Sequence, residues 1–150
     1  MVREKVRWGV LSTANIGRAA VNPAIQASTN GELVAVASRD LGRAREFASK
    51  WGIPCAYDGY ETLLEDPAVD AVYIPLPNSL HREWTIRAAE KGKHILCEKP
   101  LATTAAECRE MQAAAEANGV QLMEAFMYTS IPAPSRWSSW SAAVRSVLCA

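Results

Sequence analysis

Short runs of apolar, mostly β-branched residues alternate along this 150-residue chain with longer segments of helical character. Most of the runs are almost wholly apolar, which is typical of strands that other elements cover on both faces. They predict strands at residues 7–12, 33–38, 71–74, 94–97 and 121–125, with a weaker strand at 55–57. The intervening segments predict helices at residues 16–27, 41–51, 60–65, 79–91 and 104–118. This repeated strand–helix–strand order predicts an α/β fold, a doubly wound parallel sheet of about six strands with helices on both faces.

Glycine and proline residues mark where several of these helices begin and end. The pairs Lys91-Gly92 and Asn118-Gly119 each end a helix in the manner of a left-handed cap. Pro23 should kink or restart the first helix near Asn22, because proline has no N–H for the helical hydrogen bond.

The charge balance of the chain argues against some classes of binding partner. It has 16 Lys and Arg residues against 16 Asp and Glu residues, so its formal net charge is zero. With 49% hydrophobic residues, this is the balance of an ordinary soluble domain, and it argues against binding to nucleic acid or to an anionic membrane. No apolar run approaches the roughly 20 residues that span a bilayer, and residues 1–9 lack the apolar middle of a signal peptide. We therefore expect a cytoplasmic protein.

The cysteines predict neither a metal site nor a disulfide framework. Cys55, Cys97, Cys108 and Cys149 are widely spaced, none forms a C-x-x-C pair, and the chain has only two histidines. We expect free thiols and no bound metal.

Ligands of doubly wound sheets bind at the carboxyl ends of the strands, near the point where the strand order reverses. The residues after the first predicted strand have the spacing of the dinucleotide motif G-x-G-x-x-G: Ser12, Thr13, Ala14, Asn15, Ile16 and Gly17. Small residues at Ser12 and Ala14 let the backbone turn tightly and let a pyrophosphate approach the N–H groups at the helix start. A tight strand-to-helix turn without any ligand fits the same residues.

The second predicted strand ends in Ser38, Arg39 and Asp40. An acidic residue at this place holds the ribose 2′-hydroxyl of NAD(H), whereas an arginine attracts the 2′-phosphate of NADP(H). Arg39 and Ser38 together make a clasp for that phosphate, so the residues favour NADP(H) over NAD(H). The alternative is a solvated Arg39 beside an Asp40 that only caps the next helix.

The loop after the next buried strand, residues 75–78, is stiffened by Pro75 and Pro77. Leu76 and Asn78 complete this loop. His81 then falls in the first turn of the following helix, either at the ligand face or at the surface.

The strand after that runs into Glu98, Lys99 and Pro100. Partial burial would help Lys99 to exchange a proton with a substrate. A lysine after a strand is also often only a solvated charge.

Four segments, in this order and spacing, resemble the glucose–fructose oxidoreductase/inositol dehydrogenase (Gfo/Idh/MocA) family: W-G-V-L-S-T-A-N-I-G, V-A-S-R-D, Y-I-P-L-P-N-S-L-H and L-C-E-K-P-L-A. The likeness is greatest to its NADP-dependent D-xylose and dihydrodiol dehydrogenases, and it covers residues 6 to about 128. It implies a Rossmann domain at residues 1–128, followed in the family by a larger α/β domain that shapes the substrate pocket. That C-terminal substrate domain is absent from the 150 residues. Family members often pair through it, so the full-length parent could be a homo-oligomer.

The resemblance also implies roles for the candidate residues. Residues 12–16 would cradle the pyrophosphate, and Ser38 and Arg39 would take the 2′-phosphate. Residues 75–78 and His81 would line the nicotinamide ribose. Glu98 and Lys99 match the E-K-P motif, whose lysine lies beside the nicotinamide and polarises the oxygen of a sugar or diol carbon.

Residues 129–150 depart from the family pattern. All 16 acidic residues lie at or before Glu124, and 6 of the last 22 residues are serine. The stretch Thr129-Ser130-Ile131-Pro132 can be encoded by codons that, in a reading frame shifted by one base, encode Phe-His-Pro, a motif of the family. We therefore hypothesise a frameshifted tail. Alternatively the tail is disordered, or it forms a short helix with Trp137 and Trp140 on one face.

Two functions from different classes follow. The first is an NADP(H)-dependent oxidoreductase that transfers a hydride between nicotinamide and a sugar or diol carbon, represented by its cofactor-binding half. The second is a non-catalytic NADP(H)-binding module.

Overall fold

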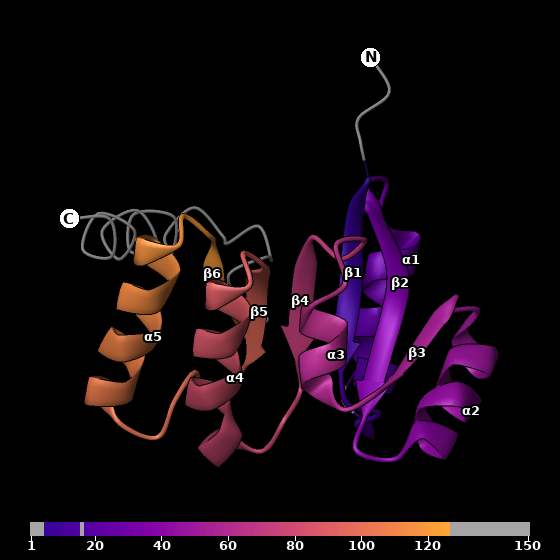
Figure 1. Ribbon diagram of the computed structural model, residues 1–150, viewed down its shortest axis with the longest axis horizontal. Helices are drawn as coiled ribbons and strands as arrows, with labels where there is room; N and C mark the ends of the chain where they lie inside the picture. Colours follow the sequence, from indigo (N-terminus) through magenta and orange to yellow (C-terminus); the bar gives the residue numbers. More distant parts are fainter. Residues whose placement is uncertain (1–4, 16, 127–150) are drawn as a thin grey trace, which may run out of the picture.

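The computed structural model describes residues 5–15 and 17–126, which form one parallel sheet with helices packed against it (Figure 1). The strands are β1 (Val6–Leu11), β2 (Gly31–Ser38), β3 (Cys55–Asp58), β4 (Ala71–Ile74), β5 (His94–Glu98) and β6 (Leu122–Ala125). The helices are η1 (Gly17–Val21), α1 (Asn22–Ala27), α2 (Leu41–Trp51), α3 (Tyr60–Leu64), α4 (Asn78–Glu90) and α5 (Ala105–Ala117). The predicted fold class and the six predicted strands are confirmed, with boundaries that differ by two residues at most.

The strands lie in the order β3-β2-β1-β4-β5-β6, and all neighbouring pairs are parallel. The chain winds outward from β1 to β3, crosses back, and winds outward again from β4 to β6. The order therefore reverses between β1 and β4, and the carboxyl ends of all six strands meet at one edge of the sheet. This edge holds the loops singled out by the sequence.

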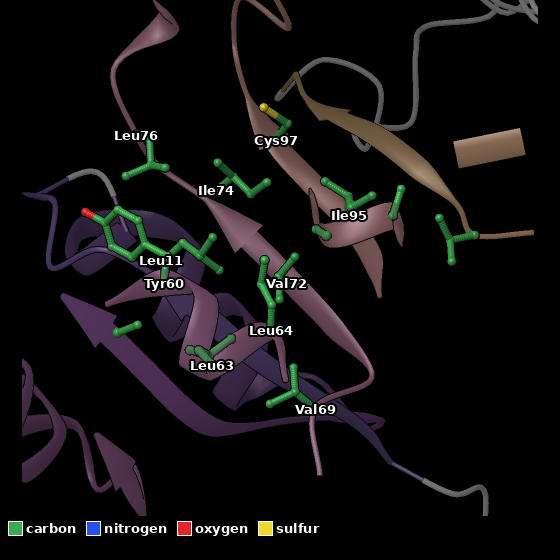
Figure 2. Close-up of a cluster of buried hydrophobic side chains, with 14 of the residues drawn as sticks. Leu11, Tyr60, Leu63, Leu64, Val69, Val72, Ile74, Leu76, Ile95 and Cys97 are labelled. Carbon is green, nitrogen blue, oxygen red and sulfur yellow. The ribbon is translucent and has the colours of Figure 1, made fainter. Parts of the chain in front are cut away.

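The two faces of the sheet have separate cores. On one face, Leu63 of α3, Ala88 of α4 and Met111 of α5 pack in a cluster with strand residues such as Val72. Figure 2 shows the part of this cluster around α3 and β4, where Leu11, Leu64 and Ile74 lie close together. On the other face, α1 and α2 contribute the buried residues Ile25, Phe47 and Ala48. The near-continuous apolar strands are explained by this coverage, because each central strand is buried from both sides.

Local sequence signals set the helix ends as expected. Gly92 and Gly119, which follow α4 and α5, have positive φ angles of 70° and 65°. The first helix does not run as one α-helix. It begins as the π-helix η1 and restarts as α1 at Asn22, with Pro23 in its first turn, so the expected restart is confirmed.

Residues 127–150, on which the three hypotheses for the tail fall, lie outside the described residues, and so does the predicted site residue Ile16. Within residues 5–15 and 17–126, no helix has the length and apolar character needed to cross a membrane.

Candidate functional site

The turn after β1 has the backbone geometry of a glycine position. Ser12 has a φ angle of 127°, in the region that L residues rarely adopt, and its side-chain Oγ accepts a hydrogen bond from the Ala14 N–H at 2.9 Å. Strain of about 1–3 kcal/mol at such a residue persists only where the surroundings hold it. Thr13 and Ala14 are half-buried and Asn15 is exposed, so the turn lies at the surface of the sheet edge.

Gly17 follows this turn, and a Cβ atom there would be in tight contact with its neighbours. A Cβ atom at Gly17 would lie 3.3 Å from Cε1 of Tyr73 and 3.6 Å from Oδ1 of Asn22. Asn22 is fully buried, and neither polar atom of its amide has a hydrogen-bond partner among the described residues. A buried amide without partners costs free energy, so a polar group that bonds to it would be stabilised there.

The three polar residues at and after the end of β2 have different roles. Ser38 is buried, and its Oγ accepts the N–H of Asp40 at 3.3 Å. Asp40 accepts the N–H of Arg43 at 3.0 Å and caps α2, as one alternative predicted. Arg39 is exposed, and its guanidinium has no hydrogen-bond or ion-pair partner among the described residues. A free guanidinium beside the first turn can therefore bind a phosphate.

The loop after β4 is divided between buried and exposed residues. Pro75 and Leu76 are buried, whereas Pro77 and Asn78 are exposed at the start of α4. His81, in the first turn of α4, is 0% exposed, so the interpretation of His81 as a surface histidine is wrong. Its two ring nitrogens lie 2.8 Å from the carbonyl oxygen of Leu76 and 3.0 Å from that of Pro100. Whether it also reaches a bound cofactor stays a prediction.

Glu98 and Lys99 follow β5 at the same edge. The hydroxyl of Tyr73 donates to Oε1 of Glu98 at 2.6 Å, and burial together with this bond raises the pKa of Tyr73 above its ordinary value. Lys99 is exposed, and its ammonium group has no partner among residues 5–15 and 17–126. The expected partial burial of Lys99 is therefore wrong for this chain, because β5 ends at Glu98 and the next residue already lies at the surface.

Three residues that the sequence did not single out complete this edge. Tyr73 connects Gly17, which its ring contacts, to Glu98, which its hydroxyl holds. Glu124 accepts the N–H of Leu101 and so ties the loop after β5 to β6. Asn22 lies beneath the first turn. A tyrosine within the otherwise aliphatic strand Ala-Val-Tyr-Ile was the one signal that could have drawn attention to Tyr73.

A groove of about 570 Å³ runs along the sheet face that carries α1 and ends at Lys99. Glu98, Lys99 and Glu124 lie at its polar end. Its other walls are largely apolar and include Trp8, Val21 and Leu96. Met123 and Phe126, which also line it, are 50% and 46% exposed. The groove gives Lys99 access to molecules on this side of the sheet.

The part of the chain that the structure describes contains no cluster of three or more potential metal-ligating side chains. Cys55, Cys97 and Cys108 are free thiols, as expected, and Cys149 lies outside the described residues. Burial raises the pKa of Cys97 to about 12, so this thiol is not a nucleophile at neutral pH.

A doubly wound parallel sheet with a tight small-residue turn at its switch point defines the class of nucleotide-binding α/β domains. A family model described as "Oxidoreductase family, NAD-binding Rossmann fold" (GFO_IDH_MocA) matches residues 6–126, and the chain belongs to this family. The family resemblance seen in the sequence is confirmed.

Two curated relatives and a solved structure show the range of this similarity. The chain is 52% identical over 129 residues to D-xylose 1-dehydrogenase (NADP(+)) 2 of Haloferax volcanii, covering 86% of this chain and 39% of that protein. It is 43% identical over 130 residues to trans-1,2-dihydrobenzene-1,2-diol dehydrogenase of Mus musculus, covering 85% and 39%. A crystal structure of KijD10, a 3-ketoreductase from Actinomadura kijaniata, in complex with NADP and TDP-benzene matches with a TM-score of 0.83 and 42% identity, covering 86% and 39%. The chain thus spans about two fifths of the length of these relatives.

Proposed function

We propose that this chain binds NADP(H) and supplies the cofactor-binding part of an oxidoreductase that acts on a sugar or diol. The observation that carries the proposal is the exposed guanidinium of Arg39, which has no partner among the described residues and follows β2 at the same sheet edge as the glycine-like turn after β1. The named activities of the relatives support the same cofactor and substrate classes.

The residues fit a dinucleotide. Residues 12–16 would hold the pyrophosphate, because a small-residue turn that leads into a helix lets a phosphate approach the backbone N–H groups at the helix start. Ser38 and Arg39 would hold the 2′-phosphate. Residues 75–78 and His81 would flank the nicotinamide ribose, with Glu98 and Lys99 across from them.

When bound, the nicotinamide ring supplies hydride transfer to or from a substrate carbon. The contribution of this chain is to orient the two reactants and to manage one proton. The ammonium group of Lys99 would donate a hydrogen bond to the substrate oxygen and polarise its bond to carbon. Tyr73 would keep Glu98, the neighbour of Lys99, fixed through its 2.6 Å hydrogen bond.

Titration of the purified 150-residue chain with NADPH and with NADH tests the proposal. We expect NADPH to quench tryptophan emission, to raise the melting temperature, and to bind more tightly than NADH. An unchanged emission and melting temperature with both cofactors would refute the proposed function.

A second candidate is a non-catalytic NADP(H)-binding module. It is favoured by the exposure of Lys99, because a site that is open to water does not exclude side reactions. Turnover of D-xylose or of a dihydrodiol by the 150-residue chain with NADP(H) decides between the two. Steady turnover supports the enzyme, whereas tight binding without turnover supports the module.

A further inference from the structure

His81 has an arrangement of hydrogen-bonding groups that the proposed function does not explain. The ring is fully buried near the start of α4, and each of its nitrogens faces a backbone carbonyl oxygen. Nε2 lies 2.8 Å from the oxygen of Leu76, in the loop after β4. Nδ1 lies 3.0 Å from the oxygen of Pro100, in the loop after β5. One ring therefore lies between the two loops that would flank a nicotinamide.

The chemistry of the contacts requires His81 to be the donor. A carbonyl oxygen only accepts hydrogen bonds, so each bond needs a proton on the imidazole nitrogen. A neutral imidazole has one N–H and donates to one loop at a time, whereas an imidazolium donates to both. In either form, the ring fills the space between the loops and fixes the distance between them.

The other histidine of the chain has the opposite arrangement. His94 is exposed, and its Nδ1 lies 3.0 Å from the backbone N of Gln121, where it accepts the N–H. The two rings thus provide an internal comparison, a donor between carbonyls and an acceptor at the surface.

We propose that His81 is a positioning residue that fastens the loop of residues 75–78 to the loop of residues 99–101. It acts on the cofactor site through the carbonyls of Leu76 and Pro100. We call these two contacts of His81 the clasp. Because Pro100 directly follows Lys99, the clasp determines the position of the Lys99 backbone. Its effect on cofactor binding rests on the proposed function, whereas the clasp itself does not.

Two substitutions separate the halves of the clasp. In His81→Gln the amide nitrogen takes the place of Nε2 and keeps a donor for Leu76, and in His81→Asn it takes the place of Nδ1 and keeps a donor for Pro100. His81→Phe removes both donors and keeps a ring. Thr85→Val is the matched control, since Thr85 lies one turn further along α4, is equally buried, and makes no hydrogen bond to either loop among the described residues.

Backbone amide NMR of the 150-residue chain without cofactor tests the clasp. We expect His81→Gln to shift the signals of Lys99 and Leu101, and His81→Asn to shift those of Leu76 and Asn78. If His81 had only a general structural role, all three substitutions would shift the signals of α4 and of both loops alike. That result would overturn the proposal. So would ring ¹⁵N signals of His81 that show an unprotonated nitrogen accepting a bond, as expected for His94, and no donating N–H.

Titration with NADPH then tests the consequence. We expect His81→Phe to weaken binding about tenfold, the Gln and Asn variants to fall between it and the wild type, and Thr85→Val to stay within about twofold. Equal affinities in all variants would show that the clasp does not reach the site. If the wild-type chain itself binds neither cofactor, the proposed function fails, and the NMR result still decides the clasp.

Discussion

The two ends of the parallel sheet hold their cations in different ways. At the amino ends of the strands, Arg7 forms two side-chain hydrogen bonds of 2.9 and 2.6 Å with Asp70. The buried ammonium group of Lys93 donates to the carbonyl oxygens of Asp66 and Val69 at 2.7 and 2.8 Å. At the carboxyl ends, the side chains of Arg39 and Lys99 are exposed and have no such partners among the described residues. Cationic side chains that bond to other residues of the chain stabilise the fold, whereas those without such partners are available to a ligand.

The largest effect that we expect is on stability, at the amino end. Lys93→Met keeps the length of the side chain but leaves the buried carbonyl oxygen of Val69 without its lysine donor and removes the charged donor to that of Asp66, which keeps only the N–H of Val69. This should lower the free energy of unfolding by about 4 kcal/mol. Urea denaturation measures this loss. Lys91→Met is the control, because Lys91 forms only surface ion pairs, with Glu61 and Glu65, and its loss should cost less than about 1 kcal/mol. Equal losses in the two variants would show that the buried, bonded lysine stabilises the fold no more than a surface ion pair does.

The next effect is on binding, at the carboxyl end. Ala14→Val places two methyl groups in the turn that would receive the diphosphate. We expect NADPH and NADH to bind about 100-fold more weakly, which corresponds to about 3 kcal/mol. Ala68→Val, at an exposed position near the amino end, should leave both affinities unchanged. Unchanged affinity in Ala14→Val would show that the turn does not hold the cofactor.

The same comparison shows what could be predicted from the sequence. Strand positions and helix ends depend on local patterns, and these predictions agree with the structure. The supports of the site depend on pairing between distant segments. Tyr73 reaches Glu98 only because β4 lies beside β5, which their separation of 25 positions in sequence does not reveal. The burial of His81 depends likewise on two loops that meet above α4.

A smaller effect should separate the two cofactors. Arg39→Ala removes one charge-assisted contact to a phosphate that only NADP(H) carries, so NADPH affinity should fall by about 2 kcal/mol while NADH affinity stays the same. Isothermal titration with each cofactor measures both values. Arg109→Ala, an exposed arginine on α5, should change neither. Equal losses for NADPH and NADH in Arg39→Ala would refute the phosphate clasp.

The smallest effect is a pH dependence of stability that the pair at the amino end should show. Hydrogen bonds from Arg7 hold the pKa of Asp70 below its usual range, so the unfolded chain takes up a proton there before the folded chain does. This stabilisation is therefore complete above the unfolded pKa of about 3.9 and is lost as the pH falls through the lower, folded value. The Arg7 and Asp70 side chains are 42% and 35% exposed, so solvent screens the pair and limits its contribution to less than about 1 kcal/mol. The difference in free energy of unfolding between the wild type and Asp70→Asn should accordingly shrink as the pH is lowered from about 5 to 3. A difference that stays constant over this range would mean that the pair at Arg7 does not contribute to stability.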